Sequence, residues 1–147
     1  MPTLPCMCAN IRRAARAITQ RYDEALRSLG LTITQFTILQ ALSLAGDITQ
    51  GRLGEILAMD STTLTRTIGA INRRGWVSKV YGADRRKRQL RLTHAGKLEL
   101  NRAIPYWQRS QESLRKQLGN ERWDDLTKLM NDRALLTVEE GASDAAI

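Results

Sequence analysis

Side chains that could recognise nucleic acid gather in two neighbouring stretches of this sequence. The first is a helical pattern after residue 60. Opposite its apolar stripe stand small polar residues and arginines: Thr62, Thr65, Arg66, Gly69 and Arg73. A helix with this face suits a major groove, where hydroxyl and guanidinium groups bond to base edges and the helix N-terminus favours phosphate.

The second stretch is a basic tip, Gly82–Arg88, between two β-prone runs. It holds Arg85, Arg86, Lys87 and Arg88 at four consecutive positions. Arginines at the tip of a hairpin can enter a minor groove, where they respond to its width and negative potential. The alternative is a solvated loop that only keeps the protein soluble.

The positive charge of the chain is concentrated on the segment that holds both stretches. Residues 49–93 contain ten Lys and Arg against three Asp and Glu, a net charge of +7, whereas the whole chain carries +8. Residues 1–48 contribute +2 and residues 94–147 contribute −1. Charge that served general solubility would be spread out, so this focus on one module indicates binding to phosphates.

Two short helical patterns and a hairpin pattern must position these groups. Apolar residues recur at helical spacing on both sides of a break at Met59-Asp60: Leu53, Ile56, Leu57, Leu64, Ile68 and Ile71. The second helix is expected to be capped by Asp60 or Ser61 and to end at Gly75. Residues 76–81 and 89–93 read as the two strands of a wing, and residues 48–49 would add a short third strand. These elements predict a winged helix-turn-helix.

The order of these elements and the text of two segments resemble the MarR family of bacterial transcription regulators. The segments are LGEILAMDSTTLTRTIGAINRRG and ADRRKRQLRLTHAG, and the most specific feature is Asp84-Arg85-Arg86 followed by Leu92-Thr93-x-x-Gly96. The resemblance runs from about Cys8 to the last helix. It implies that Arg86 is the wing-tip arginine, held by Asp84. The recognition positions that it implies are Ser61, Thr62, Thr63, Thr65 and Arg66.

Further helical patterns lie on both sides of this module. A helix over residues 9–29 should stop at Gly30, and Thr32 to Thr34 should cap another that supplies Phe36, Ile38, Leu39 and Leu42 to the core of the lobe. After the wing, Thr93 is a plausible cap for a helix from residue 95 to about 118, which Pro105 should kink or end early. A last helix runs from Trp123 to about Leu136, and the tail after residue 141 is expected to fray.

The first helix and the last two helices each show one apolar face. The winged helix-turn-helix lobe is too small to cover all three of these faces. A helical bundle formed with a second copy would bury these faces, and the homodimer would present two recognition helices to a pseudo-palindromic operator in double-stranded DNA. In the resembling family these terminal helices form the dimer interface. The predicted fold is mostly α with a small β-hairpin wing, one domain over residues 1–147. Its winged helix-turn-helix lobe is expected at 32–93 and its helical dimerisation region at 8–30 and 94–140.

The sequence does not predict an enzyme, a metal site or a cofactor. His94 is the only histidine and is expected on the surface of a first helical turn. The loops that cradle cofactor phosphates and the H-E-x-x-H metal motif are missing. No apolar run approaches the ~20 residues that span a bilayer, and residues 1–16 lack the pattern of a signal peptide. We therefore expect a cytoplasmic protein that does not associate with membranes.

The pair Cys6 and Cys8 allows three interpretations. Both could be inert thiols, or thiolate ligands of a metal, or a redox sensor. The helix N-terminus and the arginines after Cys8 would favour the reactive thiolate. In the peroxide-sensing branch of the resembling family a cysteine occupies this place, and Tyr22 has the spacing of one of the tyrosines that attend it. Arg12 stands where the other is expected.

A competing signal is a small aromatic or acidic effector, the usual ligand class of the resembling family. It would lie between the helical bundle and the DNA-binding lobe, near Arg16, Tyr22, Tyr106 and Trp107. The predicted function is a sequence-specific transcription regulator, a repressor relieved by such a ligand or by an oxidant. The alternative is a winged-helix module for non-specific nucleic-acid binding or for protein interaction.

Overall fold

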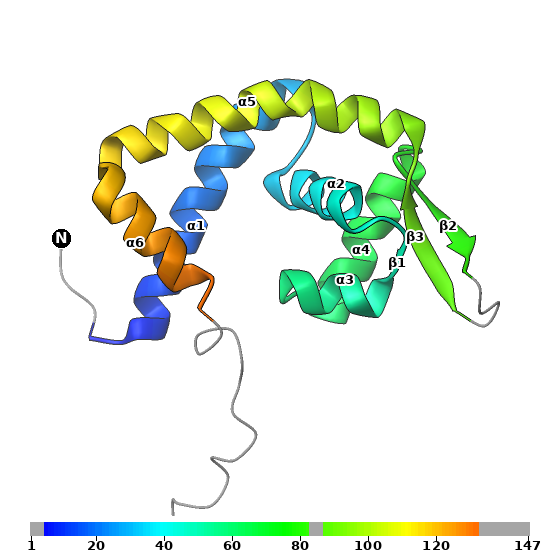
Figure 1. Ribbon diagram of the computed structural model, residues 1–147, viewed down its shortest axis with the longest axis horizontal. Coiled ribbons are helices and arrows are strands. Elements are labelled where there is room, and N and C mark those ends of the chain that lie inside the picture. Colours follow the sequence, from blue (N-terminus) through cyan, green and yellow to red (C-terminus); the bar gives the residue numbers. More distant parts are fainter. Residues whose placement is uncertain (1–4, 83–86, 133–147) are drawn as a thin grey trace, which may run out of the picture. The chain divides into compact units, whose positions relative to one another are not determined.

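Helices dominate the computed structural model of the chain, which describes residues 5–82 and 87–132 (Figure 1). The elements follow the order α1 (Met7–Leu26), η1 (Arg27–Leu29), α2 (Ile33–Ala45), β1 (Ile48–Thr49), α3 (Gln50–Leu57), α4 (Ser61–Arg73), β2 (Val77–Tyr81), β3 (Arg88–Leu92), α5 (His94–Leu118) and α6 (Asn120–Met130). The chain divides into two compact units, Met1–Ser110 and Gln111–Ile147. The predicted fold class, mostly helical with a small wing, is confirmed.

Local sequence signals explain where the first two helices stop and start. Helix α1 begins at Met7, two residues before the predicted start, and its last turn tightens into the 3₁₀ helix η1. Gly30 then ends the segment with a left-handed φ of 65°, which a glycine adopts without strain. Thr32 caps α2 as predicted, because its hydroxyl accepts from the Gln35 amide while the Gln35 side chain accepts from the Thr32 amide.

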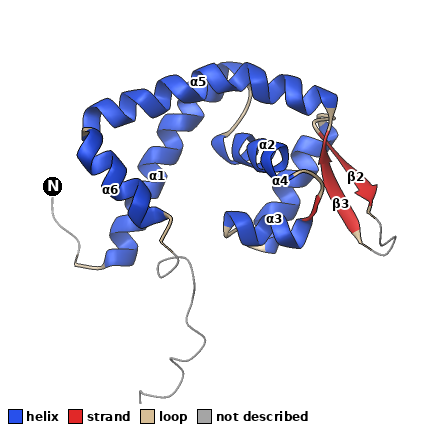
Figure 2. Ribbon diagram, in the orientation of Figure 1, coloured by secondary structure: helices blue, strands red, loops and turns tan. Residues whose placement is uncertain are grey.

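The three strands form the predicted wing, drawn in red in Figure 2, with the order β1-β3-β2 and antiparallel pairing. Strand β3 lies in the middle, where Leu90 faces both Ile48 of β1 and Lys79 of β2. Val77 pairs with Leu92, and both are buried. The alternation of β3 therefore directs its leucines into the core and leaves its polar residues outside.

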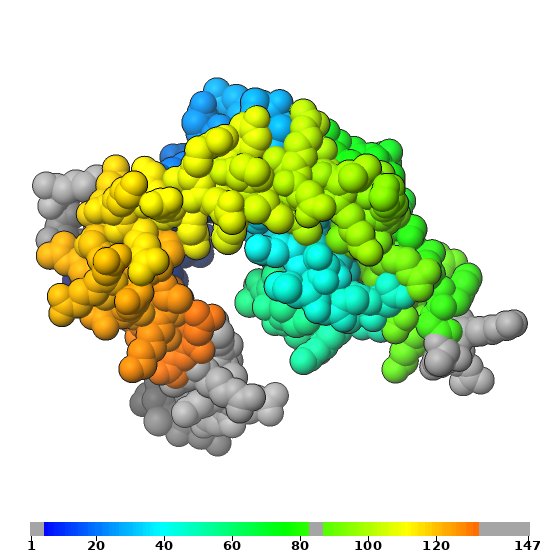
Figure 3. All heavy atoms as spheres, turned by 45° about the horizontal axis from the view of Figure 1, so that its top comes forward, coloured from blue at the N-terminus to red at the C-terminus, as the bar shows by residue number. Residues whose placement is uncertain are grey.

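The first half of α5 packs against the lobe, and one glycine makes this contact possible. A Cβ on Gly96 would lie only 2.1 Å from the Trp76 carbonyl oxygen, so no other residue fits where the helix crosses that backbone. Thr93 caps α5 as predicted, accepting from the Gly96 amide at 3.0 Å and donating to the Gly75 carbonyl at 2.6 Å. Figure 3 shows this part of α5 lying along α2.

Helix α5 runs to Leu118, the predicted end, so of the two effects expected of Pro105, a kink or an early end, the early end does not occur. Proline removes its own N–H donor and its ring crowds the carbonyl one turn earlier, but packing on both sides of it holds the helix together. Ala103 is fully buried before the proline, and Trp107 stacks on Phe36 after it with ring centroids 5.6 Å apart.

The second unit contains the end of α5 and helix α6. Gly119 separates them with a φ of 83°, and Arg115 donates to the Asn120 side chain at 2.9 Å. Helix α6 starts before the predicted Trp123 and is described to Met130, so the predicted positions up to Leu136 lie outside the described residues. Among the described residues no single helix has the length and apolar character of a membrane span. Residues 7–29 and 33–45 pass that test only together, as a pair bent by 82°.

Candidate nucleic-acid interface

Helix α4 is held at the end of a tight turn that presents one of its faces to solvent. Ala58 takes a left-handed conformation with φ of 49°, and the Met59 amide bonds to the Gly54 carbonyl at 3.0 Å. The apolar stripe of α4 is buried in the lobe: Leu64, Ile68 and Ile71. Exposed on its other sides are Ser61, Thr62, Thr65, Arg66 and Arg73, with Thr63 half-buried. The burial pattern thus leaves the predicted reading face of α4 free.

The N-terminus of α4 already holds an anionic group. Of the two predicted caps, Asp60 is the one that acts, since its Oδ1 accepts from the Thr63 amide at 2.8 Å. The hydrogen bonds from Thr63 lower the pKa of the Asp60 carboxyl, which favours its ionised form. The Thr63 amide is therefore occupied, and positive charge on this face comes from Arg66 and Arg73.

A residue that the sequence interpretation passed over joins the reading face. Gln50, the first residue of α3, donates from Nε2 to the Thr65 hydroxyl at 2.8 Å. Fifteen positions separate the two residues, so no local periodicity links them. In the sequence, Gln50 is marked only by its position at the start of α3, one residue after the Thr49 cap.

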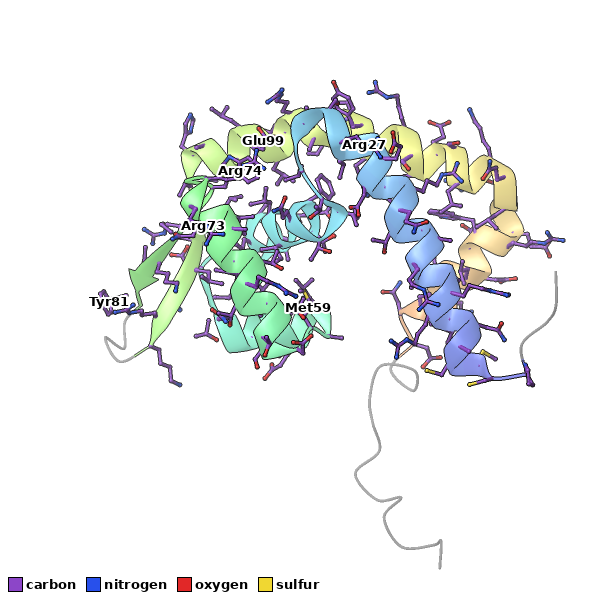
Figure 4. All side chains as sticks on the ribbon, turned by 180° about the vertical axis from the view of Figure 1, so that it is seen from behind. Arg27, Met59, Arg73, Arg74, Tyr81 and Glu99 are labelled. Carbon is purple, nitrogen blue, oxygen red and sulfur yellow. The ribbon has the colours of Figure 1, made fainter. Side chains whose placement is uncertain are left out.

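Two adjacent arginines at the end of α4 have different surroundings (Figure 4). Arg74 donates to the Gly30 carbonyl at 2.6 Å, and its guanidinium carbon lies 3.9 Å from the centre of the Trp76 ring. Arg73 has its guanidinium beside Gly69 on the exposed side of the helix. Arg73 can therefore reach a ligand, whereas Arg74 ties the end of α4 to the turn that follows η1.

The wing presents Arg88 beside an exposed tyrosine. Arg88 pairs across the hairpin with Tyr81, its guanidinium carbon 5.7 Å from the centre of the tyrosine ring. Asp84, Arg85 and Arg86, predicted at the tip, lie outside the described residues. The described part of the wing thus offers a cation and an aromatic ring close together.

The base of the wing is held by a pair of charges. The Arg91 Nε atom donates to both carboxylate oxygens of Asp47, at 3.0 and 3.1 Å. This hydrogen bond from Arg91 is the main reason why the pKa of Asp47 lies below its usual value. Because Asp47 precedes β1 and Arg91 belongs to β3, the pair fixes the hairpin to the corner after α2.

The residues predicted for redox or effector sensing lie at different depths. Cys6 is the N-cap residue of α1 and Cys8 lies in its first turn, and both thiols are free and exposed. Arg16 is exposed on the same helix. Tyr22 is buried, which raises the pKa of its hydroxyl, with Arg21 acting in the opposite direction.

The two aromatic residues of α5 in this predicted group are half-buried. The Arg109 guanidinium lies 4.6 Å from the centre of the Tyr106 ring, and Trp107 stacks on Phe36. A hollow of about 580 Å³ between α3 and α4 is lined by other residues, among them Gly54 and Met59. The assignment of Tyr106 and Trp107 to an effector site stays a prediction.

Comparisons with known proteins agree with this geometry. The model of the MarR family matches residues 29–89, which include the helix-turn-helix, β2 and the first two residues of β3. An uncharacterized HTH-type transcriptional regulator of Bacillus subtilis, YwoH, is 34% identical over 83 residues. That match covers 56% of this chain and 61% of YwoH, so it spans about three fifths of the relative's length.

Two solved structures cover more of the chain. The transcriptional regulator MosR of M. tuberculosis, in complex with DNA, is 37% identical, with a TM-score of 0.73 over 84% of this chain and 92% of MosR. A MarR variant from E. coli complexed with operator DNA is 25% identical, with a TM-score of 0.76 over 84% of this chain and 90% of that protein. The similarity to both extends beyond the residues that the family model matches.

Proposed function

The chain belongs to the MarR family, and on this premise we propose that it is a sequence-specific, DNA-binding transcription regulator. The observation that carries the proposal is the exposed face of α4, where hydroxyls and arginines stand behind a tight turn. Such a helix can place these groups against base edges in a major groove. The prediction of a regulator instead of an enzyme is confirmed by the family.

Charge supports a second contact through the wing. Arg88 stands beside Tyr81 on the hairpin, and Arg85 and Arg86 precede it in the sequence. Arg91 donates from both Nε and Nη2 to the Asp47 carboxylate, and this pair holds the base of the hairpin to the lobe. We propose that the wing arginines enter a minor groove or contact phosphates next to the groove that α4 occupies.

We propose that the protein acts as a homodimer on a pseudo-palindromic operator. Helix α1 exposes Met7 and Ile11, and α6 exposes Leu126, Leu129 and Met130. A second copy would cover these side chains, and two-fold symmetry would place two α4 helices about one turn of DNA apart, ~34–36 Å. In this proposal residues 8–30 and 94–140 form the dimerisation region of one domain, and residues 32–93 form the DNA-binding lobe.

We further propose that the regulator is a cytoplasmic repressor that an oxidant or a small effector releases from DNA. The exposure of Cys6 and Cys8 supports the oxidant, since a sensing thiol must be accessible. Cys6 has extended backbone and Cys8 is helical, so their side chains diverge and a disulfide would form more readily with the second subunit. An aromatic or acidic effector near Arg16, Tyr22, Tyr106 and Trp107 is the competing signal. Either signal would act by changing the separation of the two α4 helices.

Selection from a randomised duplex, with the reduced protein and after mild peroxide, tests these proposals. We expect enrichment of two inverted half-sites about one helical turn apart. Equal affinity for every duplex would indicate non-specific packaging, and no affinity would indicate a protein-interaction module. Peroxide should release wild type but not Cys8→Ser, and a reductant should restore binding. Unchanged affinity of oxidised wild type would eliminate the redox signal and leave the effector.

A further inference from the structure

The hollow between α3 and α4 lies directly beside the reading face of α4. Its volume is about 580 Å³, within the range of small-molecule sites in proteins. Two of the residues that line it also belong to the candidate nucleic-acid interface: Ser61 is exposed at the start of α4, and Gln50 donates to Thr65. A molecule in this hollow would therefore stand next to the groups that are proposed to read DNA.

Missing side chains on α3 leave this space open. Gly51 and Gly54 are three residues apart, so they share the face of the helix that borders the hollow. At Gly54 the two helices approach closely, because a Cβ there would lie 3.2 Å from Leu64 Cδ2. At Gly51 a Cβ would meet no atom within 4 Å. The gap thus widens from Gly54 towards the start of α3.

The inner wall of the hollow is apolar. Leu64 is buried, and Met59, in the turn between the two helices, is half-buried (Figure 4). Ala58 adds a methyl group at the exposed edge. A small hydrocarbon body that covered these side chains would remove apolar surface of both ligand and protein from water, which favours binding.

Two exposed carboxylates, Glu55 and Asp60, stand at the rim, and among the described residues that line the hollow none is basic. Hydrogen bonds from Thr63 lower the pKa of Asp60, so this carboxyl is ionised at neutral pH. Glu55 already attracts a cation, since Arg52 donates to it at 2.8 Å. The two side chains of that pair are 65% and 68% exposed, so the pair is weak and the ammonium group of a ligand can replace Arg52.

We propose that this hollow binds small organic cations, molecules with an apolar body and a protonated amine, and that such a ligand competes with DNA. The competition rests on the proposed function, in which α4 enters a major groove. This ligand class is opposite in charge to the acidic effector considered near Arg16 and Tyr22. The carboxylates of Glu55 and Asp60 repel an anion, so an acid should bind poorly in the hollow.

The first test is an NMR titration of the isotope-labelled full-length protein, without DNA, with three ligands that share one apolar body. Adamantylmethylamine is cationic at neutral pH, adamantylmethanol is neutral, and adamantanecarboxylate is anionic. We expect shifts of the Gly51, Gly54 and Ser61 amides. The amine should bind about 2- to 5-fold more tightly than the alcohol, and the carboxylate more weakly than both. No shift of these amides with any ligand would overturn the proposal, and so would a carboxylate that binds as tightly as the amine.

An isosteric double variant tests the role of the two carboxylates. Glu55→Gln combined with Asp60→Asn removes both charges, and asparagine still caps a helix well. The amine and the alcohol should then bind equally. If the preference for the amine persists in this variant, the carboxylates do not hold the head group, and the assignment of the ligand class is overturned.

Gly51→Leu and Gly51→Ala test the space. Both residues are better helix formers than glycine and begin where a Cβ meets no atom, so both variants should fold, which melting curves check. Leucine is bulky enough to fill part of the hollow and should weaken all three ligands about 10-fold, whereas alanine should have little effect. Equal binding by the two variants would place the ligand elsewhere. The comparison of the three ligands on wild type stands even if a variant does not fold.

Competition is measured on the duplex that wild type selects. The amine should release wild type and Gly51→Ala at the concentrations that shift the amides of the hollow, and Gly51→Leu only at about 10-fold higher concentrations. Equal release of all three would mean that the amine acts on the DNA. A complex of wild type that holds amine and duplex together would also overturn the competition. Should Gly51→Leu not bind the duplex, the double variant replaces it, and the amine and the alcohol should release that protein alike.

The failure of this inference can be told apart from the failure of the proposed function. A wild type that binds every duplex equally, or none, would overturn the proposed function and the competition with it. The titrations without DNA would still decide whether the hollow binds organic cations. If wild type selects a duplex while its Gly51, Gly54 and Ser61 amides respond to no ligand, only this inference is overturned.

Discussion

Arg74, at the end of α4, donates a hydrogen bond of 2.6 Å to the Gly30 carbonyl oxygen at the turn between η1 and α2. Its guanidinium also lies over the Trp76 ring, 3.9 Å from the ring centre. One side chain thus connects the last turn of the proposed recognition helix, the start of the wing and the end of the first helical segment.

Arg74→Ala should lower the free energy of unfolding by about 1–2 kcal/mol, since both the hydrogen bond and the contact with Trp76 are lost. Arg73→Ala is the matched control, because that neighbour is likewise exposed but does not bond to Gly30 or lie over Trp76. Urea unfolding followed by circular dichroism measures the difference. DNA affinity should show the reverse order, with the greater loss in Arg73→Ala. Equal stability of the two variants would contradict the stabilising role of Arg74.

Gly96→Ala should destabilise the protein by about 3 kcal/mol or more, because the new Cβ would lie 2.1 Å from the Trp76 carbonyl and force α5 off the lobe. Gly51→Ala provides the control, since a Cβ at that helical position meets no atom within 4 Å. Alanine is the better helix former, so that variant should unfold at the same or a slightly higher urea concentration. A mild effect of Gly96→Ala would mean that α5 does not pack as described.

The Asp47–Arg91 pair predicts a dependence of stability on pH. The pKa of Asp47 is lower in the folded protein than in the unfolded chain, so its contribution is complete above the unfolded pKa. That contribution is lost as the pH falls through the folded pKa. Urea midpoints of wild type should therefore fall more steeply in acid than those of Asp47→Asn. Parallel curves for the two proteins would show that the pair does not stabilise the fold.

Arg66→Ala and Arg88→Ala should affect DNA binding in different ways. If Arg66 on α4 reads base edges, its loss should cost about 1–3 kcal/mol on the preferred operator and much less on random duplex. Arg88 on the wing should contribute similarly to all sequences, and its loss should flatten the salt dependence by about one counterion. Titrations at several salt concentrations distinguish the two. Equal losses on both duplexes for Arg66→Ala would place base reading elsewhere.

Leu126→Glu combined with Met130→Glu should give monomers or unfolded chain, since a dimer interface would bury the new carboxylates without partners. Sedimentation at micromolar concentration should then yield the 16.6 kDa of one chain, against twice that mass for wild type. Leu44→Glu is the control, because Leu44 is 84% exposed on α2 and lies outside the proposed interface. It should remain a dimer. A wild type that sediments as one chain would rule out the proposed assembly.

Local patterns in the sequence determined most of the elements and the face that α4 exposes. The spacing of Leu64, Ile68 and Ile71 identified the buried stripe of α4, and the opposite face followed from it, because a helix repeats every 3.6 residues. Caps such as Thr32 and Thr93 act within one turn, so they too can be read from neighbouring residues. The effect of Pro105 within α5 could not, because whether a helix continues through a proline depends on tertiary packing, here on the stacking of Trp107 against Phe36.

Tertiary structure alone decided how the candidate interface is held together. Gln50 bonds to Thr65 fifteen positions away, and Asp47 to Arg91 across forty-four. Such pairs depend on where folding brings the backbone, and nothing in the residues next to either partner specifies the other. The Leu92-Thr93-x-x-Gly96 motif depends on both the sequence and the tertiary structure. The motif can be recognised in the sequence. Only the approach of α5 to the Trp76 carbonyl explains why its last residue, Gly96, must lack a side chain.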